Sequence, residues 1–164
     1  MVNVKYNRTA ISGNVIIMRP VKEFRKSTGA ELISNRIMMD PFNYCGCEIK
    51  NTVFISNVIF FDTFSIDSVT GNQNIIIENC TFNMGAELKG FKNSKLIIRN
   101  STFNSELLID DIQTENLELF GTTHYNNVII SNIHADIYFT HNVKIMDNHL
   151  LFLNDSNVKY CMKH

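Results

Sequence analysis

Short apolar runs, each followed by polar residues in a fixed order, recur along the chain. The segment 74–83 reads NIIIENCTFN and the segment 95–104 reads KLIIRNSTFN, with first residues 21 positions apart. Looser copies follow at 117–123 and 137–143. A repeat of about 20 residues is the size of one solenoid coil, which buries its apolar side chains against its neighbours. The pattern therefore predicts stacked coils of short strands.

A second repeat lies inside this period. It is a triplet of a polar or small residue, then Asn or Thr, then a large apolar residue, as in Ser101–Phe103 and Ser131–Ile133. Its apolar members fall on a five-residue register, and we expect them to face inward. They are Ile98, Phe103, Leu108, Val128, Ile133, Tyr138, Val143, Leu153 and Val158. In particular, we predict that Phe82 and Phe103 stack in neighbouring coils.

Asparagine is abundant between these apolar positions, while proline occurs only twice. Asparagine tolerates left-handed backbone, so it suits tight bends, and β-branched and aromatic residues suit strands. We therefore expect asparagines at the bends, where stacked amides can bond from coil to coil.

These features resemble the pentapeptide-repeat family, whose five-residue unit has Leu or Phe at its centre. Cys80–Met84, Ala86–Gly90 and Ser101–Ser105 fit that unit, and the match covers about residues 51–160. The sequence departs from the family at 113–123 and at Asn148, and it uses Val and Ile where the family has Leu and Phe. The resemblance implies an all-β fold, a right-handed parallel β-helix with about 20 residues per coil.

Residues 1–50 lack the repeat, and we expect them to form an N-terminal cap on a β-helix of residues 51–164. Pro20–Lys26 is expected to open a short helix with proline in its first turn, and Glu31–Met39 to add a helical turn or two. Such a cap would cover the open strand edge at the end of the solenoid.

Charge and hydropathy narrow the classes of partner. A formal net charge of −1 provides neither the basic field that holds nucleic acid nor the acidic field of a nucleic-acid mimic. No apolar run approaches the roughly 20 residues of a membrane-spanning helix. The polar residues 1–14 do not resemble a signal peptide. We therefore expect no membrane and no nucleic acid as partner, and a cytoplasmic location, either in the producing cell or in a host cell.

The sequence contains few candidates for metal or redox chemistry. Cys45 and Cys47 have the spacing of half a metal site or of a redox pair, but no second Cys or His pair completes a zinc site. We interpret them as reduced thiols in a turn, and Cys80 as a small packed residue of the repeat. Four histidines lie 7 to 10 residues apart and are expected on different sides of a coil: His124, His134, His141 and His149. We expect no cofactor, no metal and no catalytic residue.

An acidic stretch offers three readings. It can supply catalytic carboxylates, as in β-helix enzymes that cleave polysaccharides, form a solvated face, or contact a basic partner. We take it as a candidate interaction surface, made of Glu106, Asp110, Asp111, Glu115 and Glu118. Aromatic residues such as Phe60, Phe61 and Phe120 can also anchor an interface, but the sequence does not separate the exposed ones from the core.

The resemblance to the pentapeptide-repeat family implies a non-enzymatic binding protein, an inhibitor or effector from a bacterium or a phage that acts on a host protein. A rigid repeat offers a wide, preorganised surface for such a partner. Two alternatives remain open. One is a DNA-mimicking inhibitor of a nucleic-acid enzyme, and the other is the substrate-binding region of a larger effector such as a ubiquitin ligase. An enzyme acting alone is a further reading.

The C-terminal residues show no segment resembling a cap. The last coil would then expose an open strand edge and the end of its apolar column, which favours pairing with another chain. We therefore predict a homodimer through Leu153, Val158 and Tyr160.

Overall fold

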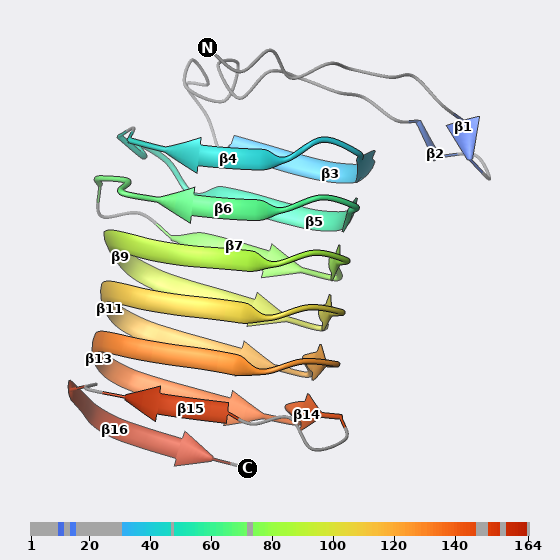
Figure 1. Ribbon diagram of the computed structural model, residues 1–164. Coiled ribbons are helices and arrows are strands. Elements are labelled where there is room, and N and C mark those ends of the chain that lie inside the picture. The colour runs from blue at the N-terminus through green and yellow to red at the C-terminus, as the bar shows by residue number, and fades with distance from the viewer. Residues whose placement is uncertain are drawn as a thin grey trace.

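The chain forms a solenoid of parallel β-strands with about five turns, stacked about 21 residues apart in sequence (Figure 1). The computed structural model describes residues 10–11, 14–15, 31–46, 48–71, 74–146, 151–154 and 157–163. These residues contain strands and turns but no helix. The predicted all-β solenoid is confirmed. In the described residues, no helix is long and apolar enough to cross a membrane.

Strand lengths differ between the sides of the solenoid. Three strands of 14 residues bend around several sides of a turn, whereas the strands that follow them span 2 residues. The strands are β1 (Ala10–Ile11), β2 (Asn14–Val15), β3 (Glu31–Met38), β4 (Phe42–Cys45), β5 (Val53–Phe60), β6 (Phe64–Asp67), β7 (Ile75–Glu78), β8 (Thr81–Phe82), β9 (Ala86–Arg99), β10 (Thr102–Phe103), β11 (Leu107–Phe120), β12 (Thr123–His124), β13 (Val128–His141), β14 (Lys144–Ile145), β15 (Leu151–Asn154) and β16 (Asn157–Lys163).

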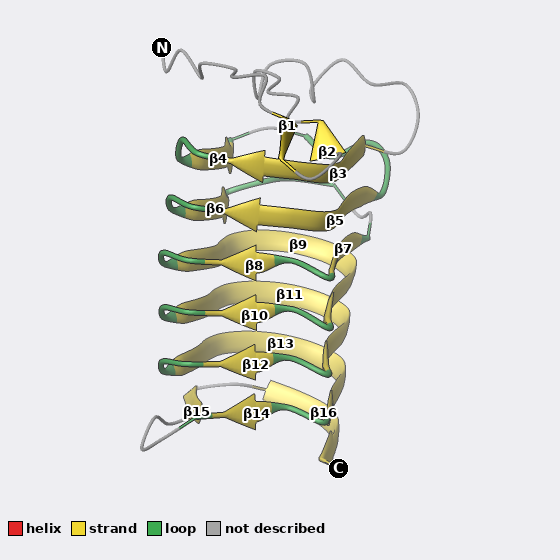
Figure 2. Cartoon of the chain, turned by 90° about the vertical axis from the view of Figure 1, so that its right-hand side faces the viewer, coloured by secondary structure: helices red, strands yellow, loops and turns green. Residues whose placement is uncertain are grey.

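Each turn has four sides, which β11 and β12 illustrate. The ladders that join β11 to β9 and β13 omit Asp111 and Glu115, so these two residues divide the strand into three straight segments. We call the sides A (107–110), B (112–114), C (116–120) and D (122–124), and we use the same letters for the aligned residues of other turns. Side D carries the short strands β8, β10, β12 and β14, which lie one above another (Figure 2).

Two corners of every turn require left-handed backbone. The corner between sides C and D has positive φ at Asn35, Asn57, Asn79, Asn100, Gly121 and Asn142. The corner between sides A and B has positive φ at Gly46, Ser68, Gly90, Asp111 and Asn132. Asparagine, aspartate and glycine adopt this conformation at the least cost, which explains the abundance of asparagine. The prediction of asparagines at the bends is confirmed.

Backbone groups at these corners are satisfied by the next turn. The Asn79 N–H donates to the Arg99 carbonyl at 3.1 Å, and the Asn100 N–H donates to the Phe120 carbonyl at 2.8 Å. Amide side chains stack between turns at another position, where Asn104 Nδ2 donates to Asn83 Oδ1 at 2.7 Å. The turns are therefore held together by hydrogen bonds at their corners as well as along their strands.

The centre of the solenoid contains a ladder of stacked rings. Phe60, Phe82, Phe103 and His124 follow one another, with ring centroids 5.0, 4.6 and 4.9 Å apart. None is more than 1% exposed. The predicted inward stacking of Phe82 on Phe103 is confirmed.

The five-residue register holds only in part. Ile98, Phe103, Val128 and Ile133 are buried as predicted, and Val143 is partly buried. Leu108 instead points outward between buried neighbours on side A. Inward and outward side chains alternate along each straight side, and this alternation starts again after each corner residue. One turn therefore contains 21 residues and not four units of five residues. The side chains of Tyr138, Leu153 and Val158 are outside the described residues.

The supposed departures from the repeat lie on the outside. Gln113 is exposed and Glu118 is partly exposed, each between buried neighbours in β11. A polar side chain in an outward position costs the core nothing, so neither residue interrupts the solenoid.

The helical turn expected at Glu31–Met39 is wrong. Residues Glu31–Met38 form β3, which pairs in parallel with β5, and β4 pairs in the same way with β6. The reason is visible in the sequence, since 33–35 and 55–57 both read ISN and place their asparagine at the same corner. The parallel ladder therefore begins within the range expected to form the cap.

Little of the remaining cap region is described. The two-residue strands β1 and β2 pair antiparallel, and β2 lies beside β3. The helix expected at Pro20–Lys26 lies outside the described residues.

Candidate functional site

The acidic residues singled out from the sequence are distributed around one turn. Glu106 precedes side A, Asp110 ends it, Asp111 and Glu115 occupy corners, and Glu118 lies on side C. Since β11 bends around three sides, these carboxylates point in different directions. They do not gather on one face.

Asp110 is the member of this set that is most engaged with its neighbours. Its Oδ1 accepts from the Ser131 hydroxyl at 2.6 Å and from Asn132 Nδ2 at 2.8 Å. The Ser131 hydrogen bond is the main cause that lowers the pKa of Asp110. Because both donors belong to the next turn, this carboxylate is tied to the stacking of the solenoid.

The cysteines are consistent with packing. Cys80 is 2% exposed, and its thiol donates to the Glu78 carbonyl at 3.2 Å. Burial raises the pKa of Cys80 to about 12, so its thiol stays protonated and unreactive. Cys45 is exposed at the end of β4, and Cys47 lies outside the described residues. In the described part of the chain, no group of three His, Cys, Asp or Glu residues is placed to hold a metal ion.

The histidines occupy different environments, as expected from their spacing. His124 is completely buried in the ring ladder, whereas His134 is exposed on side B. His141 is the last residue of side C in its turn and stacks on Phe120 with ring centroids 5.2 Å apart. His149 lies outside the described residues.

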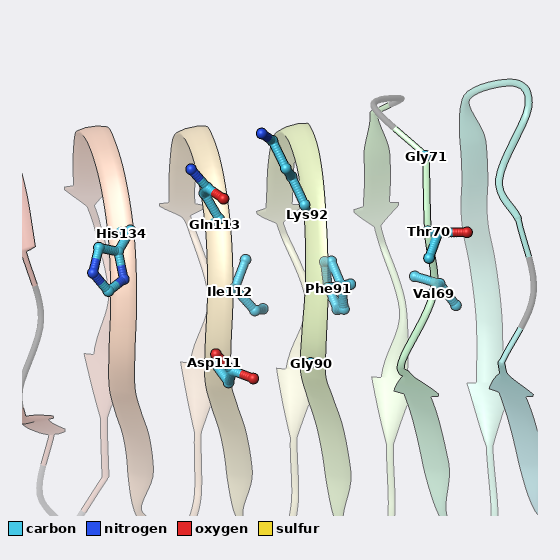
Figure 3. A pocket seen from close by; sticks show the side chains of 10 residues that line it. All are labelled: Val69, Thr70, Gly71, Gly90, Phe91, Lys92, Asp111, Ile112, Gln113 and His134. Carbon is cyan, nitrogen blue, oxygen red and sulfur yellow. The ribbon is translucent and has the colours of Figure 1, made fainter.

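A shallow hollow of about 780 Å³ lies on side B, over four successive turns. Lys92, Gln113 and His134 are paired residues of β9, β11 and β13, and Figure 3 shows Thr70 continuing their row on the turn before β9. All four side chains are exposed. Apolar residues and the corner between sides A and B complete the lining: Val69, Gly71, Gly90, Phe91, Asp111 and Ile112.

The polar side chains of the hollow are not used by the fold. Within the described residues, no hydrogen bond or ion pair is formed by the side chains of Thr70, Lys92, Asp111, Gln113 or His134. Five donor or acceptor groups therefore border one hollow without internal partners.

A second feature is an apolar patch on side D and the bend that follows it in the first two turns, made of Ile37, Met39, Ile59 and Phe61. Met39, Ile59 and Phe61 are 49%, 38% and 47% exposed. Ile37 pairs with Ile59, and the Phe61 N–H donates to the Met38 carbonyl at 2.8 Å. The patch therefore consists of adjacent side chains on a fixed backbone.

The same outward row changes character in later turns. Ile59 is followed by Thr81, Thr102 and Thr123 in the ladder of side D. A contiguous apolar patch marks an interaction site more clearly than single exposed residues do. The apolar patch at the N-terminal turns is therefore the better candidate for an interface.

Phe61 is the one patch residue that was expected to anchor an interface, and neither the hollow nor the rest of the patch was predicted. Phe60 is 1% exposed and its neighbour Phe61 is 47% exposed. An error of one residue in the assigned register would therefore exchange core and surface positions. The hollow was not foreseeable before the turns were aligned, because its residues lie 21 or 22 positions apart in the sequence.

Comparisons of the chain with protein-family models, with curated proteins and with solved structures gave no match. The interpretation of function therefore depends on the geometry of these two surfaces.

Proposed function

We propose that this protein is a non-enzymatic binding protein that holds a partner protein on its apolar patch. The observation that carries the proposal is the adjacency of Met39, Ile59 and Phe61, each more than a third exposed, on side D and the bend that follows it. Large apolar and aromatic side chains that are desolvated at the centre of an interface supply most of the binding free energy.

The backbone beneath the patch favours tight binding. β3 is paired with β5, and β5 with β8, so Ile37 and Ile59 lie in paired strands. Met39 and Phe61 follow directly after the ends of β3 and β5, and the Phe61 N–H is bonded to the Met38 carbonyl. A surface that is already ordered loses little conformational entropy when a partner binds. A solenoid of this kind suits an inhibitor or effector that recognises one folded partner.

The degenerate repeats support a further part of the proposal, that the fold is a right-handed β-helix of the pentapeptide-repeat type. The units around Phe82 and Phe103 support it, while the 21-residue turn departs from four units of five. We further propose that the protein comes from a bacterium or a phage and acts in the cytoplasm of the producing cell or of a host cell. No observation favours the DNA-mimic alternative, since the acidic set surrounds the turn, and none favours a region of a larger effector.

Phe61→Ser is expected to abolish capture of the partner, whereas Tyr125→Ser is expected to leave it unchanged. Tyr125 is a matched control because it is 48% exposed at the same bend, three turns away. Affinity capture followed by mass spectrometry would identify the partner, and sedimentation of the purified pair would measure binding. Loss of at least about tenfold in affinity, or about 1.4 kcal/mol, is expected for Phe61→Ser. Equal effects of the two variants, or a wild-type protein that captures nothing, would contradict the proposal.

The homodimer through the C-terminal end stays a prediction. β15 and β16 pair with β13 on one side, and no strand in the described part of the chain pairs with their other edge. Val158 aligns with the buried Ala135 of the turn before it. Val158→Asp is therefore expected to convert a dimer to a monomer in sedimentation velocity. A wild-type protein that is monomeric at micromolar concentration would show that this end forms no dimer.

A further inference from the structure

We propose that the hollow on side B is a second binding site, independent of the apolar patch, and that its ligand is an uncharged, hydroxyl-rich molecule such as a short sugar chain. The hollow has no role in the proposed protein interface, because sides B and D carry different outward rows of the turn.

The polar groups of the hollow match a ligand that both donates and accepts. Lys92 offers only donors and Asp111 only acceptors, while the Thr70 hydroxyl, the Gln113 amide and the His134 ring each offer both. A sugar hydroxyl is likewise a donor and an acceptor. An anion would satisfy the donors alone and would be opposed by the Asp111 carboxylate.

The spacing of the row favours an extended ligand. Neighbouring strands of a sheet lie about 4.8 Å apart, so the row from Thr70 to His134 spans about 14 Å over three steps. Figure 3 shows these side chains at similar positions on neighbouring turns, with Asp111 and Gly90 in a second row beside them. A chain of several sugar units can contact this length, whereas a single small metabolite cannot.

Val69, Phe91 and Ile112 also border the hollow, but they are 2%, 4% and 1% exposed and pack in the core, so a ligand would meet the exposed polar side chains instead. An extended peptide is less suited. Peptides that add to sheets use main-chain groups at a strand edge, and here β11 and β13 are paired on both sides along side B.

A glycine keeps part of the hollow open. Gly90 has φ +64° at the corner between sides A and B, and a Cβ there would lie 3.3 Å from Asp67 Oδ1. The turns on either side place Ser68 and Asp111 at the same corner with φ of 52° and 50°. Asparagine is therefore expected to be accepted at this corner, so Gly90→Asn should fold and place a side chain at the border of the hollow, as Asp111 does on the next turn.

The test is a screen of the full chain against an array of neutral oligosaccharides, sulfated heparin-derived oligosaccharides and extended peptides. The best neutral oligosaccharide is then titrated at up to millimolar concentration, with amide chemical shifts followed by nuclear magnetic resonance. We expect a neutral oligosaccharide to bind and to shift the amides of Gly90, Lys92, Gln113 and His134. Gly90→Asn and Gln113→Ala are expected to weaken binding by about tenfold or more. Lys95→Ala, which removes an exposed lysine on side C, is the matched control and should bind normally.

Circular dichroism of Gly90→Asn establishes that a loss of binding is not a loss of fold, and Gln113→Ala changes only an exposed side chain. Failure of every neutral oligosaccharide to bind would overturn the proposal. So would preference for sulfated oligosaccharides or for peptides, or shifts confined to other sides of the solenoid. None of these outcomes affects capture of a partner by the apolar patch, so the two proposals fail separately.

Discussion

Phe103→Ala is expected to lower the free energy of unfolding by about 3–5 kcal/mol, as truncation of a buried aromatic ring does. Phe103 is 1% exposed and stacks between Phe82 and His124, with centroids 4.6 and 4.9 Å away. Its removal takes the ring contacts from two turns and leaves a cavity between them. Neighbouring turns cannot close this cavity, because their separation is set by the strand ladders of β8, β10 and β12.

Urea unfolding followed by far-ultraviolet circular dichroism would measure this loss. Phe120→Ala is a suitable control, because Phe120 is 38% exposed at the end of side C. It is expected to cost less than about 1 kcal/mol, as most surface substitutions do. A loss below about 1 kcal/mol for Phe103→Ala would contradict the ring ladder.

The parts of the fold that could be predicted are those that depend on repetition. Phe82 and Phe103 occupy equal places in two nearly identical segments, so one coil period places them in contact. Asparagine at the bends was predictable for a similar reason, since left-handed backbone selects few residue types. The helical turn predicted at Glu31–Met39 is wrong because Glu31–Met38 repeats the pattern of Val53–Phe60, its partner strand.

The candidate surfaces were less accessible from the sequence. Within side D, inward and outward residues alternate, so the apolar run of residues 58–61 contributes to both the core and the apolar patch. A continuous apolar run does not indicate which of its residues face inward. Here only the position of the corner at Asn57 decides which residues do. Predicting the hollow would also require four turns to be aligned correctly, although their lengths differ by one residue.

His124 is expected to make the protein less stable as the pH falls below about 6.5, and this is the second large effect. The ring is fully buried between Phe103 and the last turns, and Nε2 lies 2.9 Å from the Thr122 hydroxyl. Nδ1 has no hydrogen-bond partner among the described residues. Burial lowers the pKa of His124 from 6.5 to about 4.

The direction follows from proton binding. Between pH 6.5 and 4 the unfolded chain binds a proton at this histidine and the folded chain does not, so lowering the pH favours unfolding. The loss should reach about 2 kcal/mol at pH 5 and about 3 kcal/mol once the pH is below 4, relative to pH 7.5. Asp110 acts in a lower range, because its stabilising carboxylate is lost only below the ordinary pKa of aspartate.

His124→Phe would continue the ring ladder without a titrating group, so its free energy of unfolding should be nearly constant between pH 7.5 and 5. His134→Gln, which changes an exposed histidine, should keep the slope of the wild-type protein. Urea unfolding at several pH values compares the three proteins under the same conditions. The wild-type slope should therefore disappear in His124→Phe alone. A slope that persists in this variant would show that other groups cause the acid sensitivity, and a wild-type protein without a slope would show that the ring can be protonated in place.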